Sequence, residues 1–387
     1  MLAQTAKNAG LQPLVIDLFA DLDTQSYAAD FKQLTALTID CLTPALDYFV
    51  NHYGVTQLVY GSGFEQHPDS LRYLQSRFTL LGNSAETFIR LQNPVDFFAV
   101  LNQLNIPTPE TSFVAPDNPQ NWLIKPTRGQ GGVGIQRWNA NLGLHADVYW
   151  QKYQAGSQHS VLFLADGQHL QIIGFNTQWT VQDYSFPRAA WECSNGAPRR
   201  AEKKWNDSEE FIFAGIINHC DLDATHKAQI TDWLTKLVPA FELTGLNSLD
   251  FIHAEGKNYV LEINPRPPAS MQCYDADLLR RHIMTASPLK DWQSCLQPPI
   301  QSGYTGYQII YAEQDIQIPN GYRWENGVMD IPVAGAICKT GQPICSIIAH
   351  HNQAHAVLNE LTIKQHIIQR SLYTWKTTPA LINSLNP

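Results

Sequence analysis

The sequence lacks long apolar runs, paired cysteines and a block of basic residues. The apolar stretch at residues 14–22 is interrupted by Asp17 and Asp21, and no run approaches about 18 apolar residues, so we expect no signal peptide and no membrane span. The seven cysteines are scattered and form no C-x-x-C pair, which argues against a disulfide framework and against a zinc site. Free thiols of this kind favour a reducing cytoplasm.

Basic residues are scarce relative to acidic ones. The chain has 26 Lys and Arg against 35 Asp and Glu, a net charge of −9, which argues against a nucleic-acid partner and against an anionic membrane surface. An anionic substrate would therefore need local cations and a metal ion. Several basic residues do gather in residues 188–204, where a solvated surface and a contact with a phosphate or a carboxylate substrate both remain open.

The length of 387 residues and the apolar content of 44% allow two or three globular domains. Residues 11–85 favour a small α/β unit, with strands expected at 14–18, 58–60 and 78–82 and helices near 28–37 and 44–53. This alternation predicts a parallel sheet with ligands at the strand ends. The turn at residues 61–63, Gly-Ser-Gly, lacks the third glycine of a dinucleotide-binding fingerprint, so it is either a substrate contact or a tight structural turn.

Residues 246–270 carry the strongest functional signal. Two apolar runs flank a short stretch that contains a glycine, which predicts an antiparallel hairpin. If residues 255–257 form its loop, Asp250 lies directly across from Glu262. Asn264 then shares a face with Glu262, because side chains alternate along a strand. A one-residue slip, as in a two-residue loop, would break this cluster.

Two carboxylates and an amide on one face suit a hard cation. Magnesium takes oxygen ligands and is usually shared between one or two carboxylates and the phosphates of a substrate. Pro265 ends the second strand, and Arg266 follows with a planar fork of donors suited to phosphate. These residues together indicate a site for moving a phosphoryl group. The alternative is an ordinary surface hairpin with one solvated face.

A second informative stretch, residues 122–138, has two short strands around a glycine-rich loop. Lys125 lies at the end of the entering strand, and the loop contains Gly129, Gly131, Gly132 and Gly134. Glycine allows positive φ angles and lets backbone N–H groups lie against an oxyanion. No Gly-Lys-Ser/Thr follows, so the loop is not a P-loop. A phosphate-binding flap and a flexible hairpin are both compatible with it.

The segment Glu262-Ile-Asn-Pro-Arg-Pro267, together with the glycine-rich loop upstream, resembles the ATP-grasp superfamily. Members bind magnesium ATP between two α+β subdomains, and most join a carboxylate to an amine through an acyl-phosphate. The resemblance implies an α/β and α+β chain with the ATP-grasp fold. Its domains would be a Rossmann-like α/β domain at 1–85, an ATP-grasp domain at 86–290, and a β-rich cap with a final helix at 291–387, as in members similar to biotin carboxylase and glycinamide ribonucleotide synthetase.

The same resemblance implies roles for the residues above. Glu262 and Asn264 would be ligands of one or two Mg²⁺ ions, or of Mn²⁺ in their place, and Asp250 would be a further ligand or an acid behind them. Arg266 would contact a phosphate or the acyl-phosphate. It would act in catalysis with Lys125, which would also hold the α and β phosphates of ATP.

The resemblance also locates the rest of the nucleotide. Arg128 and the backbone of the glycine-rich loop would fold over the β and γ phosphates. The strand-like segment Gln151, Lys152 and Tyr153 would hold the adenine edge through its backbone groups. His159 lies where many relatives place a ribose-binding acid, and it is either that contact or a surface histidine.

The chain departs from the family pattern upstream of the glycine-rich loop. No lysine lies between Lys32 and Lys125, although many members use one there to contact the phosphates. Arg90 either substitutes for it or the contact is missing. This departure keeps open the alternative of a catalytically idle ATP-binding module.

The resulting prediction is a cytoplasmic ATP-dependent ligase that uses ATP, a carboxylate substrate and an amine such as an amino acid. The whole chain is most similar to ATP-grasp proteins, including glutamate ligases, of one-carbon cofactor pathways based on pterins and furans. Two related activities remain alternatives, a carboxylase that uses bicarbonate and a small-molecule kinase. A homodimer is compatible with the resemblance.

Overall fold

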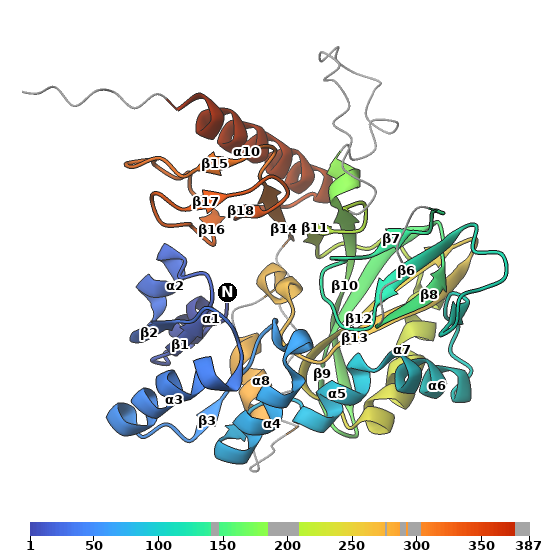
Figure 1. Ribbon diagram of the computed structural model, residues 1–387. Coiled ribbons are helices and arrows are strands. Elements are labelled where there is room, and N and C mark those ends of the chain that lie inside the picture. The colour runs from blue at the N-terminus through green and yellow to red at the C-terminus, as the bar shows by residue number, and fades with distance from the viewer. Residues whose placement is uncertain (141–146, 185–208, 275–276, 287–291, 293–302, 376–387) are drawn as a thin grey trace, which may run out of the picture.

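The computed structural model describes residues 1–140, 147–184, 209–274, 277–286, 292 and 303–375 (Figure 1). The described chain forms an N-terminal α/β unit, a small antiparallel sheet, and a large antiparallel sheet that runs into the C-terminal part. None of the helices in these ranges is long and apolar enough to cross a membrane.

The N-terminal unit has two short pairs of parallel strands. β1 (Leu14–Asp17) pairs with β2 (Asp30–Gln33), and β3 (Gln57–Leu58) pairs with β4 (Thr79–Leu80). Its helices are α1 (Leu2–Asn8), α2 (Leu22–Tyr27), α3 (Ile39–Tyr53) and α4 (Pro68–Arg77). The expected parallel pairing of the strands near 58 and 80 is confirmed, whereas the expected strand at 14–18 pairs with residues 30–33 in a separate sheet. The helix expected at 28–37 is wrong, because residues 30–33 pair with β1 and this tertiary pairing outweighs the local helical spacing.

Two capped helices lead into the small sheet. α5 (Ala85–Gln92) begins after Ser84, whose side chain accepts the Thr87 N–H, and α6 (Pro94–Gln103) begins after Asn93, whose side chain accepts the Val95 N–H. The sheet order is β5-β8-β6-β7, with β5 (Thr111–Ser112), β6 (Trp122–Pro126), β7 (Gln136–Arg137) and β8 (Val148–Lys152). The glycine-rich loop joins β6 to β7, which confirms the hairpin expected there.

The large sheet has eight strands in the order β13-β12-β9-β10-β11-β14-β18-β16. Their bounds are β9 (Ser157–Asp166), β10 (Leu170–Thr180), β11 (Phe213–Ile217), β12 (Thr244–Ala254), β13 (Lys257–Asn264), β14 (Tyr304–Tyr311), β16 (Val328–Met329) and β18 (Pro343–His351). β14 pairs with β11, so the boundary proposed at residue 291 falls between strands of one sheet. The C-terminal part adds the pair β15 (Ile316–Gln317) and β17 (Ile337–Cys338), and α10 (Ala354–Thr374) packs on β14 and β18.

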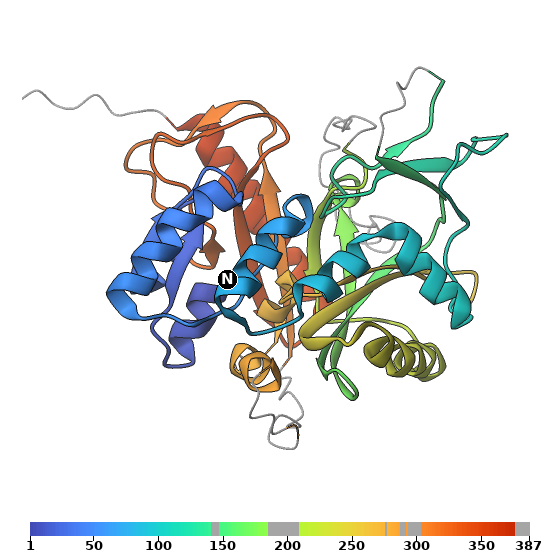
Figure 2. The same cartoon turned by 60° about the horizontal axis from the view of Figure 1, so that its bottom comes forward.

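Different helices cover the two faces of the large sheet. α7 (Ala224–Phe241) packs on one face, where its apolar residues join Val161, Leu249 and Phe251 in one core cluster. α8 (Leu278–Ala286) and α1 pack on the other face against Leu162 and Leu246. Figure 2 shows α7 and the small sheet on opposite sides of the β12–β13 hairpin. Strand residues that point away from α7 therefore point toward the space beside the small sheet.

Acidic side chains at the start of α2 connect the N-terminal unit to the C-terminal part. Asp23 accepts the N–H groups of Asp330 and Ile331 at 3.1 and 2.8 Å, and the Leu22 N–H donates to the Ile331 carbonyl at 2.9 Å. Asp21 lies in the same contact. Burial, and then the nearby carboxylate of Asp330, raises the pKa of Asp21 to about 7.

This raised pKa predicts that the protein loses stability as the pH rises. A carboxyl group whose pKa is higher in the folded state than its usual 3.8 binds more protons when folded, so its cost appears between about pH 4 and pH 7. We expect Asp21→Asn to match the wild type in free energy of unfolding at about pH 4 and to exceed it at about pH 8. Urea unfolding at both pH values measures this difference. Asp117→Asn is the control, and parallel pH profiles for Asp21→Asn and the wild type would contradict the prediction.

Candidate functional site

The β12–β13 hairpin pairs the two acids, although its loop differs from the expected one. The loop has two residues, Glu255 and Gly256, rather than three. A β-bulge at Leu261 then shifts the pairing by one residue, so that Asp250 lies across from Glu262. The predicted pairing is confirmed. The prediction that a two-residue loop would break the cluster is wrong, because the bulge restores the register.

Asp250, Glu262 and Asn264 meet on the face of the sheet that points away from α7. Asn264 Nδ2 donates to Asp250 Oδ2 at 3.2 Å and to Glu262 Oε1 at 3.3 Å, and Gln178 Nε2 on β10 donates to Asp250 Oδ1 at 3.3 Å. Burial, and then the Glu262 carboxylate, raises the pKa of Asp250 well above its usual range. Two carboxylates held this close together favour a bound cation.

The oxygen atoms of this cluster fit a magnesium ion. Within the part of the chain that the structure describes, no group of three His, Cys, Asp or Glu side chains could hold a metal ion. Mg²⁺ does not need such a cage, because it binds one or two carboxylates, keeps several waters and takes its remaining ligands from substrate phosphates. The pair of carboxylates and the amide therefore suit a metal ion that arrives with a nucleotide.

Lys125 reaches the same space from the small sheet. Its ammonium donates to Gln151 Oε1 at 2.7 Å, and Gln151 Nε2 donates to Thr111 Oγ1 at 3.1 Å. Burial lowers the pKa of Lys125 to about 8, and the Glu262 carboxylate opposes this shift. Burial, and then the same carboxylate, raises the pKa of Tyr149, which pairs with Lys125 across the strands. A lysine of one sheet thus lies within electrostatic range of an acid of the other.

The glycine-rich loop folds onto the start of β11. The Gly131 carbonyl accepts the Phe213 N–H at 2.9 Å. A Cβ on Gly132 would lie 1.8 Å from the Phe211 carbonyl oxygen, so only glycine allows this approach. The φ angles of Gly131, Gly132 and Gly134 are +61°, +78° and +81°, which also favour glycine. The loop therefore connects the small sheet to the large one.

Gly132→Ala is expected to detach this loop from β11. The added Cβ would collide with a backbone carbonyl, so we expect tryptic cleavage at the exposed Arg128 to become about tenfold faster or more, and exchange of the Phe213 amide hydrogen to increase. Gly131→Ala is the matched control, because its backbone has the same positive φ but nothing lies within 4 Å of the new Cβ. Equal cleavage rates for the two variants would contradict the collision. Timed proteolysis and hydrogen exchange measure both effects.

The predicted adenine-binding segment lies at the end of β8. The Gln151 side chain is buried and holds Lys125. The Lys152 N–H donates to the Glu110 carbonyl at 2.8 Å and the Tyr153 N–H to the Asn121 carbonyl at 2.7 Å, so both N–H groups already have backbone partners. An adenine contact through these two N–H groups is not supported. The location remains a prediction that depends on the other backbone groups of this segment.

Arg266 is held by Glu65, a residue that the sequence analysis did not assign. Arg266 Nε donates to Glu65 Oε1 at 2.9 Å, and Nη2 donates to Asn264 Oδ1 at 3.3 Å. Glu65 Oε2 accepts the Gly63 N–H at 2.7 Å. Only 11% of the Arg266 side chain and 2% of the Glu65 side chain are exposed. The one sequence signal for Glu65 was its place two residues after the Gly-Ser-Gly turn at a strand end.

The N-terminal unit also holds the backbone that follows the acids. The Pro265 carbonyl accepts the Tyr60 hydroxyl at 3.2 Å and Asn83 Nδ2 at 2.9 Å, and the same Asn83 amide donates to Asn247 Oδ1 at 2.7 Å. Tyr60 and Asn83 follow β3 and β4. The strand ends of the α/β unit thus face the site, as expected for a parallel sheet.

His159 lies away from the acids. It pairs with Phe251 on β12, which belongs to the α7 face, whereas Asp250 points to the opposite face. Its Nδ1 is 3.4 Å from both Thr177 Oγ1 and Cys220 Sγ, and only 5% of the residue is exposed. Burial lowers the pKa of His159 to about 4, so the ring is neutral. The structure does not support the ribose contact.

Arg90 also lies elsewhere and does not replace the missing lysine. Its Nη1 donates to the Ala240 carbonyl at 3.1 Å, and its guanidinium lies 5.0 Å from the centre of the Phe241 ring, at the end of α7. Arg128 is exposed before the glycine-rich loop, and its phosphate contact remains a prediction, as does that of the Gly129 backbone. The basic segment 188–204 lies outside the described residues.

Comparisons with known proteins agree with this geometry. Residues 92–270 match the family model of an ATP-grasp domain. No curated protein matches the sequence. Residues 92–270 include the glycine-rich loop, Lys125 and the complete β12–β13 hairpin.

Solved carboxylases have a similar fold. A Rhizobium etli pyruvate carboxylase aligns with a TM-score of 0.69 at 14% identity over 94% of this chain. This chain spans only 36% of that carboxylase chain. A Campylobacter jejuni biotin carboxylase aligns with a TM-score of 0.64 at 14% identity, and the alignment covers 93% of this chain and 86% of that one. A third similar structure is the biotin carboxylase domain of a Hydrogenobacter thermophilus 2-oxoglutarate carboxylase, a dimer solved with MgADP, ADP and bicarbonate. It aligns with a TM-score of 0.65 at 14% identity, and the alignment covers 93% of this chain and 85% of that one. At this identity the likeness shows the fold alone.

The family match and the structural neighbours lead to the same conclusion, which the converging residues of the two sheets had indicated. The chain has the ATP-grasp fold, and residues 92–270 match the family model of an ATP-grasp domain.

Proposed function

We propose that this chain is an ATP-dependent ligase that joins a carboxylate to an amine through an acyl-phosphate and releases ADP and phosphate. One observation carries the proposal. Lys125 of the small sheet lies within electrostatic range of Glu262 of the large sheet. The Asn264 amide joins Glu262 to Asp250 by donating a hydrogen bond to each carboxylate. A cation for phosphates and oxygen ligands for a metal ion therefore border one space, as the transfer of a phosphoryl group requires.

The chain's own residues would act by positioning and by neutralising charge. Lys125 would donate to phosphate oxygens, and Arg266, which Glu65 and Asn264 orient, would present its remaining N–H groups to the transferring phosphoryl group. Asp250, Glu262 and Asn264 would hold Mg²⁺, which when bound neutralises charge on the phosphates. No side-chain nucleophile is needed, because the substrate carboxylate attacks the γ-phosphorus itself.

The test is ADP release in the presence of paired substrates. We expect ADP to appear only when both a carboxylic acid and an amine are added, and an amide product to form in equal amount. The narrowest form of the proposal is the addition of glutamate to a pterin- or furan-type cofactor, so glutamate with such acids is the first pair to test. ADP release that needs only one of the two substrates would contradict a ligase.

A carboxylase is the second candidate, and one observation favours it. The similar solved structures are carboxylases, and one of them was solved with MgADP and bicarbonate. A carboxylase of this fold would release ADP when bicarbonate and the acceptor of the carboxyl group are added. It would need no further amine. A small-molecule kinase would instead yield a stable phosphorylated product. The same assay, with bicarbonate depleted or restored and the products analysed by mass, separates these outcomes.

A catalytically idle nucleotide-binding module is the third candidate. It is favoured by the absence of any lysine between Lys32 and Lys125 and by the position of Arg90, which bonds to the end of α7. Such a module would bind MgADP or MgATP without turnover across a broad panel of acids and amines. Calorimetric binding together with the ADP assay distinguishes it from an enzyme.

A further inference from the structure

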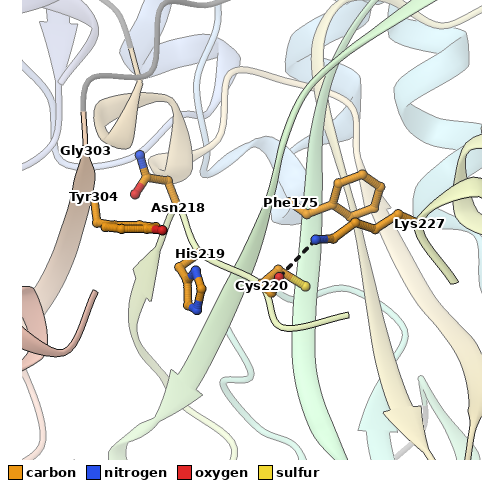
Figure 3. Close-up of a pocket in the computed structure, with 7 residues that line it drawn as sticks. All are labelled: Phe175, Asn218, His219, Cys220, Lys227, Gly303 and Tyr304. Carbon is orange, nitrogen blue, oxygen red and sulfur yellow. Dashed lines mark hydrogen bonds between the residues drawn. The ribbon is translucent and has the colours of Figure 1, made fainter. Parts of the chain in front are cut away.

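A cavity of about 380 Å³ lies on the α7 face of the large sheet (Figure 3). Its walls come from β10, the segment after β11, the start of α7 and the start of β14. Phe175 of β10 pairs with Val161, which belongs to the core cluster under α7, whereas Asp250 points to the other face. The cavity is therefore separate from the nucleotide site proposed above. Its volume is at the lower end of the range for small-molecule sites.

Lys227 supplies the positive charge of this cavity. Its ammonium donates to the Cys220 carbonyl at 3.0 Å, and it lies 5.9 Å from the centre of the Phe175 ring. An ammonium group has three N–H donors, so the single backbone bond leaves donors for a ligand. Among the described residues, no carboxylate forms an ion pair with Lys227. Within the described residues, this ammonium therefore has no carboxylate in direct contact.

Aromatic rings form the other walls. Tyr304 and His219 meet edge to face, with ring centres 5.1 Å apart, on the side of the cavity opposite Phe175 and Lys227. His219 Nε2 lies 2.7 Å from Asp221, whose side chain is 91% exposed and points out to solvent. Among the residues that the structure describes, none of the side chains that line the cavity is acidic. These walls suit a flat, apolar body with a negative end.

Two hydrogen bonds fix the side chain of Asn218, which also lines the cavity. Asn218 Nδ2 donates to the Cys273 carbonyl at 2.8 Å, and Asn218 Oδ1 accepts the Thr305 N–H at 2.7 Å, so both ends of this amide hold the backbone. Recognition therefore depends on Lys227 and on the aromatic rings, and not on the amide.

We propose that this cavity binds a small aromatic carboxylate, with the carboxylate on Lys227 and the ring between Phe175 and Tyr304. A charge-assisted hydrogen bond to the ammonium supplies the affinity for the anion, and the aromatic walls supply the selectivity for a flat body. The cavity is a site for a second ligand that does not compete with the nucleotide. Binding of the aromatic carboxylate in this cavity does not depend on which reaction the nucleotide site performs.

The test uses 4-fluorobenzoate as the probe and its neutral analogue 4-fluorobenzamide, followed by ¹⁹F NMR on the full chain. We expect the benzoate to bind the wild type, and the benzamide to bind about tenfold more weakly or worse. Lys227→Met should weaken benzoate binding by about tenfold or more, which is the loss of one charge-assisted bond, and Lys227→Arg should keep most of it. Lys236→Met is the matched control, because it removes an exposed lysine of the same helix that pairs with Asp232.

Three further measurements complete the test. Thermal unfolding checks that Lys227→Met folds, and Tyr304→Leu, which keeps the charge, should also weaken benzoate binding. Added MgADP should leave benzoate binding unchanged. The proposal would be overturned if benzoate bound Lys227→Met and the wild type equally, or if benzamide bound the wild type as tightly as benzoate. It would also be overturned if MgADP displaced benzoate, or if benzoate did not bind at all.

Discussion

Glu262→Gln is expected to abolish turnover and leave the chain folded. The substitution keeps the shape of the side chain but removes one of the two carboxylates that would hold Mg²⁺, so we expect kcat to fall by about 100-fold or more. Magnesium-dependent binding of ADP should weaken as well, and calorimetry can measure it before any substrate is known. Stability should be unchanged or slightly higher, because the Glu262 carboxylate contributes to the raised pKa of Asp250 and its removal relieves that repulsion.

Glu255→Gln is the control for this substitution. It removes an exposed carboxylate from the loop of the same hairpin, outside the cluster that Asn264 joins. We expect it to retain wild-type turnover and ADP binding. If Glu262→Gln still bound ADP with the magnesium dependence of the wild type, the assignment of the metal ligands would have to be abandoned.

Glu65→Ala is expected to destabilise the protein by about 3–5 kcal/mol, because it leaves the buried Arg266 guanidinium without its charged partner. It should also lower kcat, since Arg266 would lose the contact that fixes it beside Asn264. Urea unfolding measures the first effect and the ADP assay the second.

Two comparisons separate stability from positioning. Glu86→Ala removes the partner of Arg72 from an exposed ion pair and should cost no more than about 1 kcal/mol. The double variant Glu65→Ala/Arg266→Met should regain much of the stability lost in Glu65→Ala, because no buried charge remains unpaired, yet it should stay inactive. A Glu65→Ala variant as stable as the wild type would show that the buried pair contributes nothing to the fold.

The pairing of Asp250 with Glu262 was predictable, but the loop length and the bulge that produce this pairing were not. Strand periodicity puts Glu262 and Asn264 on one face in any hairpin. The register across the two strands depends on the loop length and on bulges, and here a two-residue loop and a bulge at Leu261 compensate for each other. Nothing in the local sequence distinguishes this arrangement from a three-residue loop without a bulge.

Long-range contacts account for the other differences. Residues 30–33 have helical spacing, but they form a strand because β1 provides a partner for them. Glu65 lies 201 residues before Arg266, so no local pattern could connect the two. His159 occupies the expected place in the chain, and only its pairing with Phe251 reveals that it faces α7.

The sequence by itself determined the chemistry of this protein: the acids and the amide of one strand pair, the glycines that let the loop approach β11, and the lysine that precedes them. These are local properties, because residue type and strand periodicity decide which groups a short segment can present. Only the tertiary structure decided which groups meet, since the bulge, the partner of Arg266 and the face of His159 depend on how distant strands pair and pack.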